Sequence, residues 1–179
     1  RVGNLDAERS AELFDNDRDR AMFDLMLYTG QRDRAVRTLK VGDIDQANDR
    51  FHLNTDAAGL KGAKGMRPLL VAKQSVYSWL EDHPAGDDPD AYLITKLPDA
   101  ARGDPYSPID NSTVSRRIKE AAREAGIERA DDRGHPHNLR HSFVRWAYID
   151  LDMDVQTIKY MGGWAANSTT FEETYFNIL

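Results

Sequence analysis

The hydrophobic positions along the chain mostly follow helical spacing. Between residues 16 and 28 a group of apolar side chains sits among charged ones, which predicts a helix, and Gly30 stands where that helix would end. Similar patterns predict further helices over residues 32–40, 73–81, 112–125, 137–151, 155–161 and 168–178. The chain is therefore expected to be mainly helical.

Two short segments alternate between polar and apolar residues as strands do. Residues 50–54 form one, and residues 67–71 form the second, after a stretch at 59–65 that is rich in glycine and carries lysine. This pattern predicts a β-hairpin with a long cationic tip. Residues 92–95 are expected to be a brief extended piece. The expected fold class is therefore α+β, mainly α with a small β-hairpin or sheet.

The length and composition predict a single globular domain spanning residues 1–179. A chain of 179 residues can bury a substantial core, and none of its apolar runs is long enough to cross a bilayer. The absence of cysteine excludes disulfides, thiolate catalysis and zinc bound by cysteine. We therefore expect a soluble, cytoplasmic protein with no membrane partner.

The charge of the chain is acidic overall but basic in places. The net charge of −6 argues against a protein that coats DNA without regard to sequence, because phosphate binding depends on lysine and arginine. The expected helix at 112–125, however, carries Arg116, Arg117, Lys119 and Arg123. These residues form either a solvated helix face or a surface that contacts DNA, and the sequence leaves both interpretations open.

Three of the five histidines lie beside an arginine at the expected start of a helix. His137 and His141 have the spacing of zinc ligands, and His135 could add a third, but Asn138 stands where zinc proteases carry their acidic base. Alternatively, His137 and Arg140 could bind an anion such as a phosphodiester at the helix N-terminus. In a third interpretation, these histidines only pack inside the fold.

Taken in order, several motifs resemble the catalytic domain of the tyrosine recombinases, the phage integrase family. The matching segments are Thr29-Gly30-x-Arg32, Lys61-Gly62-Ala63-Lys64, His137-x-Leu139-Arg140-His141, Gly162-Gly163-Trp164 and Tyr175. The resemblance covers nearly the whole chain, and the motif around Arg140 is the most specific. It implies site-specific recombination of the integrase type, in which DNA is cut and rejoined through a 3′-phosphotyrosyl intermediate.

The resemblance also implies roles for individual residues. Tyr175 would attack the scissile phosphate, while Arg32 and Arg140 would hold its non-bridging oxygens. From the hairpin, Lys61 would protonate the leaving 5′-oxygen, with Lys64 as the alternative. No metal ion or other cofactor is implied.

Two further residues of the matching motifs receive supporting roles. His137 would assist proton transfer or hydrogen-bond the phosphate. Trp164 would donate its indole N–H or buttress the site, at a position where other members of the family use histidine. The catalytic set implied by the resemblance thus draws on five separate stretches of the chain.

The implied partner is double-stranded DNA, on which the family assembles as a tetramer. Lys64, Arg67, Arg116 and Arg117 are expected to contact it. The family's N-terminal DNA-clamping domain is expected to lie outside this chain.

The sequence departs from the family at Ala35, where an acidic residue is common and Asp33 could substitute, and in the longer segment 164–175. The alternatives are an enzyme that relaxes DNA like a type IB topoisomerase, or a DNA-binding module without catalytic activity.

Overall fold

The computed structural model describes residues 12–53, 65–96, 104, 106–126 and 135–175. Its longer helices are α2 (Asp17–Thr29), α5 (Lys73–Asp82), α6 (Asn111–Glu124), α8 (Pro136–Arg145) and α9 (Val155–Gly162). Two shorter helices are α3 (Asp33–Arg37) and α10 (Thr169–Tyr175). The strands are β1 (Ile44–Asp45), β2 (Arg50–Leu53) and β3 (Gly65–Pro68). The α+β fold class expected from the sequence is confirmed.

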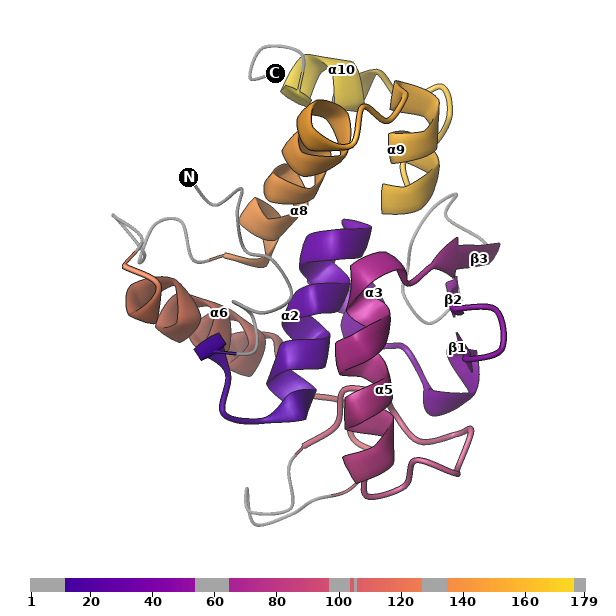
Figure 1. Cartoon of the computed structure of the whole chain (residues 1–179), viewed down its shortest axis with the longest axis vertical. Helices are drawn as coiled ribbons and strands as arrows, with labels where there is room; N and C mark the ends of the chain where they lie inside the picture. The colour runs from indigo at the N-terminus through magenta and orange to yellow at the C-terminus, as the bar shows by residue number, and fades with distance from the viewer. Residues whose placement is uncertain (1–11, 54–64, 97–103, 105, 127–134, 176–179) are drawn as a thin grey trace.

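Helix α2 forms the centre of the molecule, with α5 and α8 packed against it (Figure 1). The side-chain oxygen of Asn16 accepts a hydrogen bond from the backbone N–H of Asp19 at 2.8 Å, which caps the start of the helix. Gly30 ends the helix in the left-handed conformation, with φ of 67°. The predicted helix at 16–28 and its stop are therefore confirmed.

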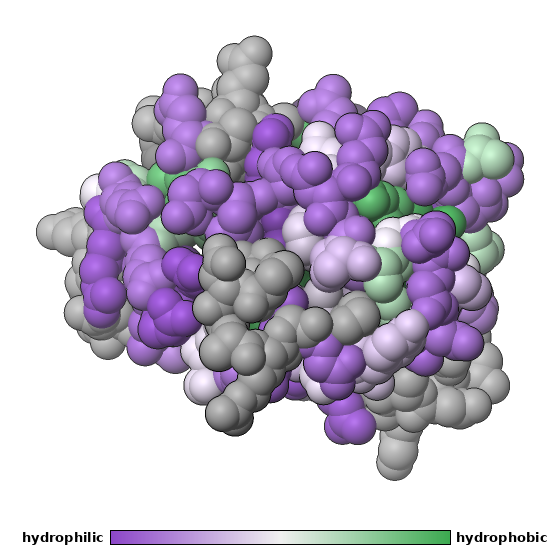
Figure 2. All heavy atoms as spheres, turned by 90° about the horizontal axis from the view of Figure 1, so that it is seen from below, coloured by the Kyte–Doolittle hydropathy of each residue, from purple (hydrophilic) through white to green (hydrophobic). Residues whose placement is uncertain are grey.

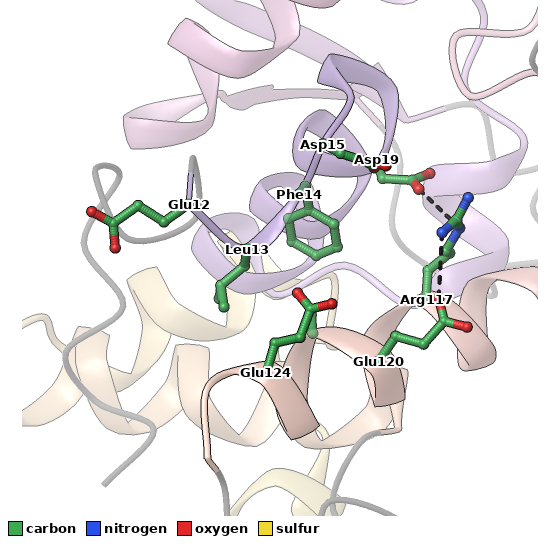
Figure 3. A pocket seen from close by; sticks show the side chains of 9 residues that line it. Glu12, Leu13, Phe14, Asp15, Asp19, Arg117, Glu120 and Glu124 are labelled. Atoms are coloured by element: carbon green, nitrogen blue, oxygen red, sulfur yellow. Dashed lines mark hydrogen bonds and ion pairs between the residues drawn. The ribbon is translucent and has the colours of Figure 1, made fainter.

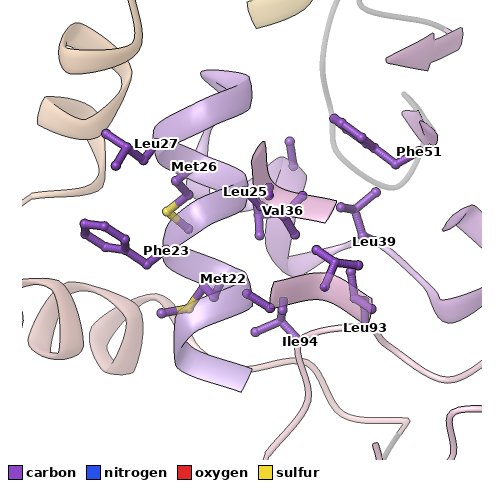
Figure 4. Close-up of a cluster of buried hydrophobic side chains, with 14 of the residues drawn as sticks. Met22, Phe23, Leu25, Met26, Leu27, Val36, Leu39, Phe51, Leu93 and Ile94 are labelled. Carbon is purple, nitrogen blue, oxygen red and sulfur yellow. The ribbon is translucent and has the colours of Figure 1, made fainter. Parts of the chain in front are cut away.

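The larger hydrophobic core surrounds α2. Met22, Leu25 and Met26 are fully buried there and lie close to Val36, on α3 (Figure 4). Removing this apolar surface from water is the main force that holds the first helices together. This packing holds α2 and α3 in place and thereby fixes the short turn between them, which contains Gly30 and Arg32.

The three strands form an antiparallel sheet in the order β1-β2-β3, in which Phe51 pairs with Arg67. The predicted first strand and its antiparallel pairing with a return strand are confirmed, but the bounds of 67–71 predicted for the return strand are wrong. Strand β3 spans Gly65–Pro68, and Leu70 adopts a left-handed φ of 50° that begins a 3-10 turn leading into α5. Helix α3 is also shorter than predicted, because Lys40 is extended and pairs with Tyr92.

Helices α8, α9 and α10 form a second cluster at the end of the molecule that contains the described C-terminal part of the chain (Figure 1). A π-helical turn at Trp146–Asp150 continues α8, so the predicted helix at 137–151 is confirmed in position. The buried residues of this cluster are Phe143, Val144, Ala147, Ile158, Met161, Phe171 and Tyr175. The second cluster therefore contains the late tyrosine that the sequence singled out.

The face of the molecule drawn in Figure 2 is mostly hydrophilic, and hydrophobic side chains appear on it only in small separate patches. Within the described residues, no helix combines the length and the apolar character needed to cross a membrane.

Candidate active site

Arg140, on α8, lies at the point where the two clusters meet. Its side chain is 2% exposed, and Nη1 donates hydrogen bonds to the backbone oxygens of Gly30 and Gly162. The guanidinium carbon lies 3.3 Å from the centroid of the Trp164 ring, an arrangement that adds cation–π attraction. Arg140 therefore joins the end of α2, the end of α9 and the turn that carries Trp164.

The guanidinium of Arg140 retains a donor that the fold does not use. Its Nη2 atom is buried and has no acceptor within hydrogen-bonding geometry among the residues that the structure describes, although the guanidinium also interacts with the phenol of Tyr175. Burial, followed by the nearby charge of Arg32, lowers the pKa of Arg140 to about 9, so the group stays protonated at neutral pH. A buried cation with an unused N–H group is suited to bind an anionic oxygen.

Tyr175 is the last residue of α10 and is 2% exposed. Its ring packs against those of His141, Trp164 and Phe171, with centroid distances of 5.2, 5.7 and 4.9 Å. Burial raises the pKa of Tyr175, whereas its contact with Arg140 and the charge of Arg32 lower it and so oppose this effect. The phenol is thus protonated at neutral pH, and two arginines favour its ionised form.

The two histidines of α8 lie side by side in its first turns. The rings of His137 and His141 meet edge to face, with centroids 4.5 Å apart. Burial, then the charges of Arg140 and Arg32, lower the pKa of His137. Burial, then His137 and Arg140, lower the pKa of His141. Both imidazoles are therefore neutral at pH 7, and a neutral imidazole can accept a proton.

Arg32 immediately precedes α3 and has an exposed side chain. None of the residues that the structure describes forms an ion pair with it. Its charge acts on Arg140, on His137 and on Tyr175. The structure therefore brings together five of the six side chains that the sequence proposed as catalytic. The sixth, Lys61, lies outside the described residues, as does Lys64.

Sequence reasoning missed the residue that separates Gly30 from Arg32. Gln31 is buried, and its side-chain amide donates to the backbone oxygen of Met161 at 2.6 Å and to that of Thr29 at 3.1 Å. These bonds fix the turn before α3 to the end of α9. A residue in the variable position of a motif gives no signal of such a contact, because its partner lies 130 residues away.

Two features of the structure require a glycine at position 30. Besides its left-handed φ, Gly30 lies so close to Phe143 that a Cβ atom would be 2.3 Å from the ring. The sequence predicted only that this glycine ends a helix. Its close approach to α8 allows its carbonyl to meet Arg140.

The arginines expected to contact DNA are placed differently from one another. Arg67 is buried, with its guanidinium carbon 3.9 Å from the centroid of the Tyr160 ring. Arg117 forms ion pairs with Asp19 at 3.1 Å and with Glu120 at 3.3 Å (Figure 3). Arg116 also pairs with Glu120, at 3.1 Å. The two arginines of α6 thus pair with carboxylates of α2 and α6.

The pocket beside Arg117 has a volume of about 230 Å³. Most of the polar side chains around it are carboxylates, as Figure 3 shows for Glu12, Asp15 and Glu124. Such a lining repels phosphate. This pocket is therefore not where an anionic ligand would bind.

Two other expectations concerned acidic and metal-binding groups. Asp33, which could have replaced the acidic residue missing at Ala35, forms an ion pair with Arg37 on its own helix at 3.2 Å. In the described part of the chain, no group of three or more His, Cys, Asp or Glu side chains is arranged to hold a metal ion.

Comparisons with known proteins show the family of the chain. A model of the phage integrase family matches residues 7–178. The tyrosine recombinase XerH of Campylobacter jejuni is 26% identical over 97% of this chain and 46% of its own length. The tyrosine recombinase XerC of Haemophilus ducreyi is 26% identical over 93% of this chain and 53% of its own length. The chain thus spans about half the length of these curated relatives.

Solved structures show the same fold. XerA recombinase superimposes with a TM-score of 0.69 at 21% identity, covering 96% of this chain and 62% of its own. XerH site-specific recombinase, in a post-cleavage complex with its palindromic difH substrate, gives a TM-score of 0.65 at 20% identity, covering 98% of this chain and 49% of its own. At these identities the likeness concerns the fold alone. The match over residues 7–178 shows the family, and the chain belongs to the phage integrase family.

Proposed function

We propose that residues 1–179 act as the catalytic domain of a site-specific tyrosine recombinase, which cuts and rejoins double-stranded DNA through a 3′-phosphotyrosyl link at Tyr175. The observation that carries this proposal is the convergence of one phenol with two guanidinium groups and a neutral imidazole. The tyrosine is buried against Arg140, and the charges of Arg32 and Arg140 both act on it. Such a set can supply a nucleophile and stabilise charge on a phosphate.

Cleavage would begin with the phenol of Tyr175. The phenol oxygen of Tyr175 attacks the phosphorus and the bond from phosphorus to the 5′-oxygen breaks. The phenolic proton passes to His137 or to water, and Lys61 gives a proton to the leaving 5′-oxygen. In rejoining, a 5′-hydroxyl attacks the phosphotyrosine and releases the phenol. The energy of the phosphodiester is retained, so no ATP is required.

Arg140 and Arg32 would stabilise the phosphate oxygens during both steps. The unused Nη2 donor of Arg140 supports this role, as does the exposed position of Arg32 beside it. For Trp164 we propose a buttressing role, because the face of its ring lies against the guanidinium of Arg140. An indole packed in this way limits the positions that the arginine can adopt.

We further propose that the partner is double-stranded DNA, that the working assembly is a tetramer on that DNA, and that it operates in the cytoplasm to integrate DNA. The relatives named as tyrosine recombinases and the solved complexes of XerH with difH support the DNA partner. They favour recombination over the relaxation of DNA. We also propose that Lys64, Arg67, Arg116 and Arg117 contact the DNA.

A suicide substrate tests this function directly. Duplexes with a randomised core and a nick beside the scissile phosphate lose the short strand after cleavage, which traps the covalent complex. We expect the wild-type chain to form an adduct that survives denaturing electrophoresis, and Tyr175→Phe to form none, because the nucleophilic oxygen is gone.

The matched control for this test is Tyr148→Phe. Tyr148 is 40% exposed on the turn after α8, and its substitution should leave the yield of adduct unchanged. An adduct of normal yield with Tyr175→Phe would show that another residue is the nucleophile. A folded wild-type chain that binds DNA without forming any adduct would refute the catalytic function.

A further inference from the structure

Lys159, on α9, is buried to an unusual degree for a lysine. Its side chain is 3% exposed, and Nζ donates to the backbone oxygens of Ala166 at 3.4 Å and Ser168 at 3.1 Å, and to the carboxylate of Glu172. Lysine is almost never fully buried unless it is paired, because removing its charge from water costs several kcal/mol, roughly, before any compensation. An apolar residue would fill the same place without that cost.

All three partners of Lys159 belong to the segment that leads into α10 and forms it. This helix has seven residues, and a helix of that length is not stable without tertiary contacts. Glu172 precedes Tyr175 by three residues, so the two side chains are neighbours on the helix surface. The contacts of Lys159 therefore act on the part of the helix that carries the tyrosine.

The same turn of α9 also holds the rest of the site. The backbone oxygen of Gly162 accepts from Arg140, and that of Met161 accepts from Gln31. The hydroxyl of Tyr160 donates to the backbone oxygen of Met66, on β3, at 2.7 Å. Successive residues of one helical turn thus connect to α8, to the turn before α3, to the sheet and to α10.

We propose that Lys159 is a positioning residue that fixes α10 on the end of α9 and thereby holds Tyr175 against Arg140. It acts through Glu172 and through the backbone oxygens of Ala166 and Ser168, and it does not contact DNA. This inference rests on the proposed function of Tyr175. It also gives a role to the long segment between Trp164 and Tyr175, because the lysine anchors that segment at three points between its ends.

A set of variants separates positioning from mere stabilisation. Lys159→Met keeps the length of the side chain but removes the counter-charge of Glu172, whose side chain is 34% exposed. The double variant Lys159→Met/Glu172→Gln removes both charges, so that no charge is left without its partner. Lys73→Met is the matched control, because Lys73 forms a surface ion pair with Asp49 at 2.9 Å.

Three quantities are measured on the full chain: the melting temperature, the single-turnover rate of adduct formation on the suicide duplex, and the hydrogen exchange of the amides in residues 169–175. We expect Lys159→Met to melt lower and the double variant to recover most of that loss. We expect both to form adduct at least about 10-fold more slowly, with faster exchange in α10 only. Lys73→Met should match the wild type in rate and in exchange.

The proposal is overturned if the double variant regains the wild-type rate and α10 protection together with its melting temperature, because the lysine would then serve stability alone. If the double variant does not fold, the single variant Glu172→Gln tests the proposal instead. It keeps the lysine and its bonds to backbone oxygens. Unchanged rate and exchange in that variant would also overturn the proposal. Exchange is read without DNA, so a wild-type chain that forms no adduct would refute the proposed function and leave the positioning of α10 still measurable.

Discussion

At the scale of single residues, Arg140 combines a structural and a chemical role. One terminal nitrogen satisfies the backbone oxygens of Gly30 and Gly162, and the other has no acceptor in the described part of the chain. The Trp164 ring lies against the planar face of the same group. The side chain can therefore hold two helix ends together and still donate to a phosphate.

Substitution of Arg140 should separate these roles. Lysine carries the charge but cannot present several donors in fixed directions, so Arg140→Lys should slow adduct formation by ~10² to 10³ while DNA binding changes little. Arg140→Ala should in addition lower the free energy of unfolding by roughly 2–4 kcal/mol, because two buried carbonyls lose their donor. Single-turnover cleavage and urea unfolding measure the two effects. Wild-type cleavage by Arg140→Lys would contradict the proposed role.

At the scale of elements, the first turns of α8 bring two imidazoles close to two guanidinium groups. Burial and the charge of Arg140 lower the pKa values of His137 and His141 below that of a free histidine, about 6.5, and the charge of Arg32 also lowers that of His137. The folded protein therefore binds fewer protons than the unfolded chain between the lowered values and 6.5. The stability that the two neutral imidazoles contribute is fully present above pH 6.5. It is lost as the pH falls from 6.5 through the lowered pKa values.

The two histidines should therefore make the free energy of unfolding depend on pH. The free energy of unfolding should fall between pH 7.5 and pH 5.5, because protonation favours the unfolded chain. In His137→Asn/His141→Asn the fall should be smaller, since asparagine does not titrate. Urea unfolding at several pH values measures both proteins. Equal slopes would show that the fall comes from other groups.

Some of these elements could be predicted from the sequence alone, and others could not. The helices were predictable, because caps such as Asn16 and stops such as Gly30 leave local marks. The end of β3 was not, because the apolar run after Pro68 resembles a strand while Leu70 turns into a left-handed conformation. Strand β1 was missed because two residues give no periodicity.

In the candidate site, too, some residues could be predicted from the sequence and others could not. Arg32, His137, Arg140 and Tyr175 could be proposed from motifs, because their residue types and order are distinctive. The contacts of Gln31 and Lys159 could not be, since each depends on backbone oxygens whose positions only the folded chain fixes.

At the scale of the whole molecule, the site lies where two hydrophobic clusters meet. Arg32 follows the helix at the centre of the first cluster, whereas Tyr175 belongs to the second. Arg140 joins the two through its bonds to the ends of α2 and α9. The geometry of the site therefore depends on how the end formed by α8, α9 and α10 sits on the rest of the molecule.

The proposed function depends above all on Tyr175 being the residue that becomes linked to DNA. The most direct measurement is to digest the trapped complex with protease and nuclease and to identify the modified peptide by mass spectrometry. We predict a single peptide in which Tyr175 carries a nucleotide through its 3′-phosphate. A nucleotide on any other residue, or one linked through its 5′-phosphate, would contradict the account.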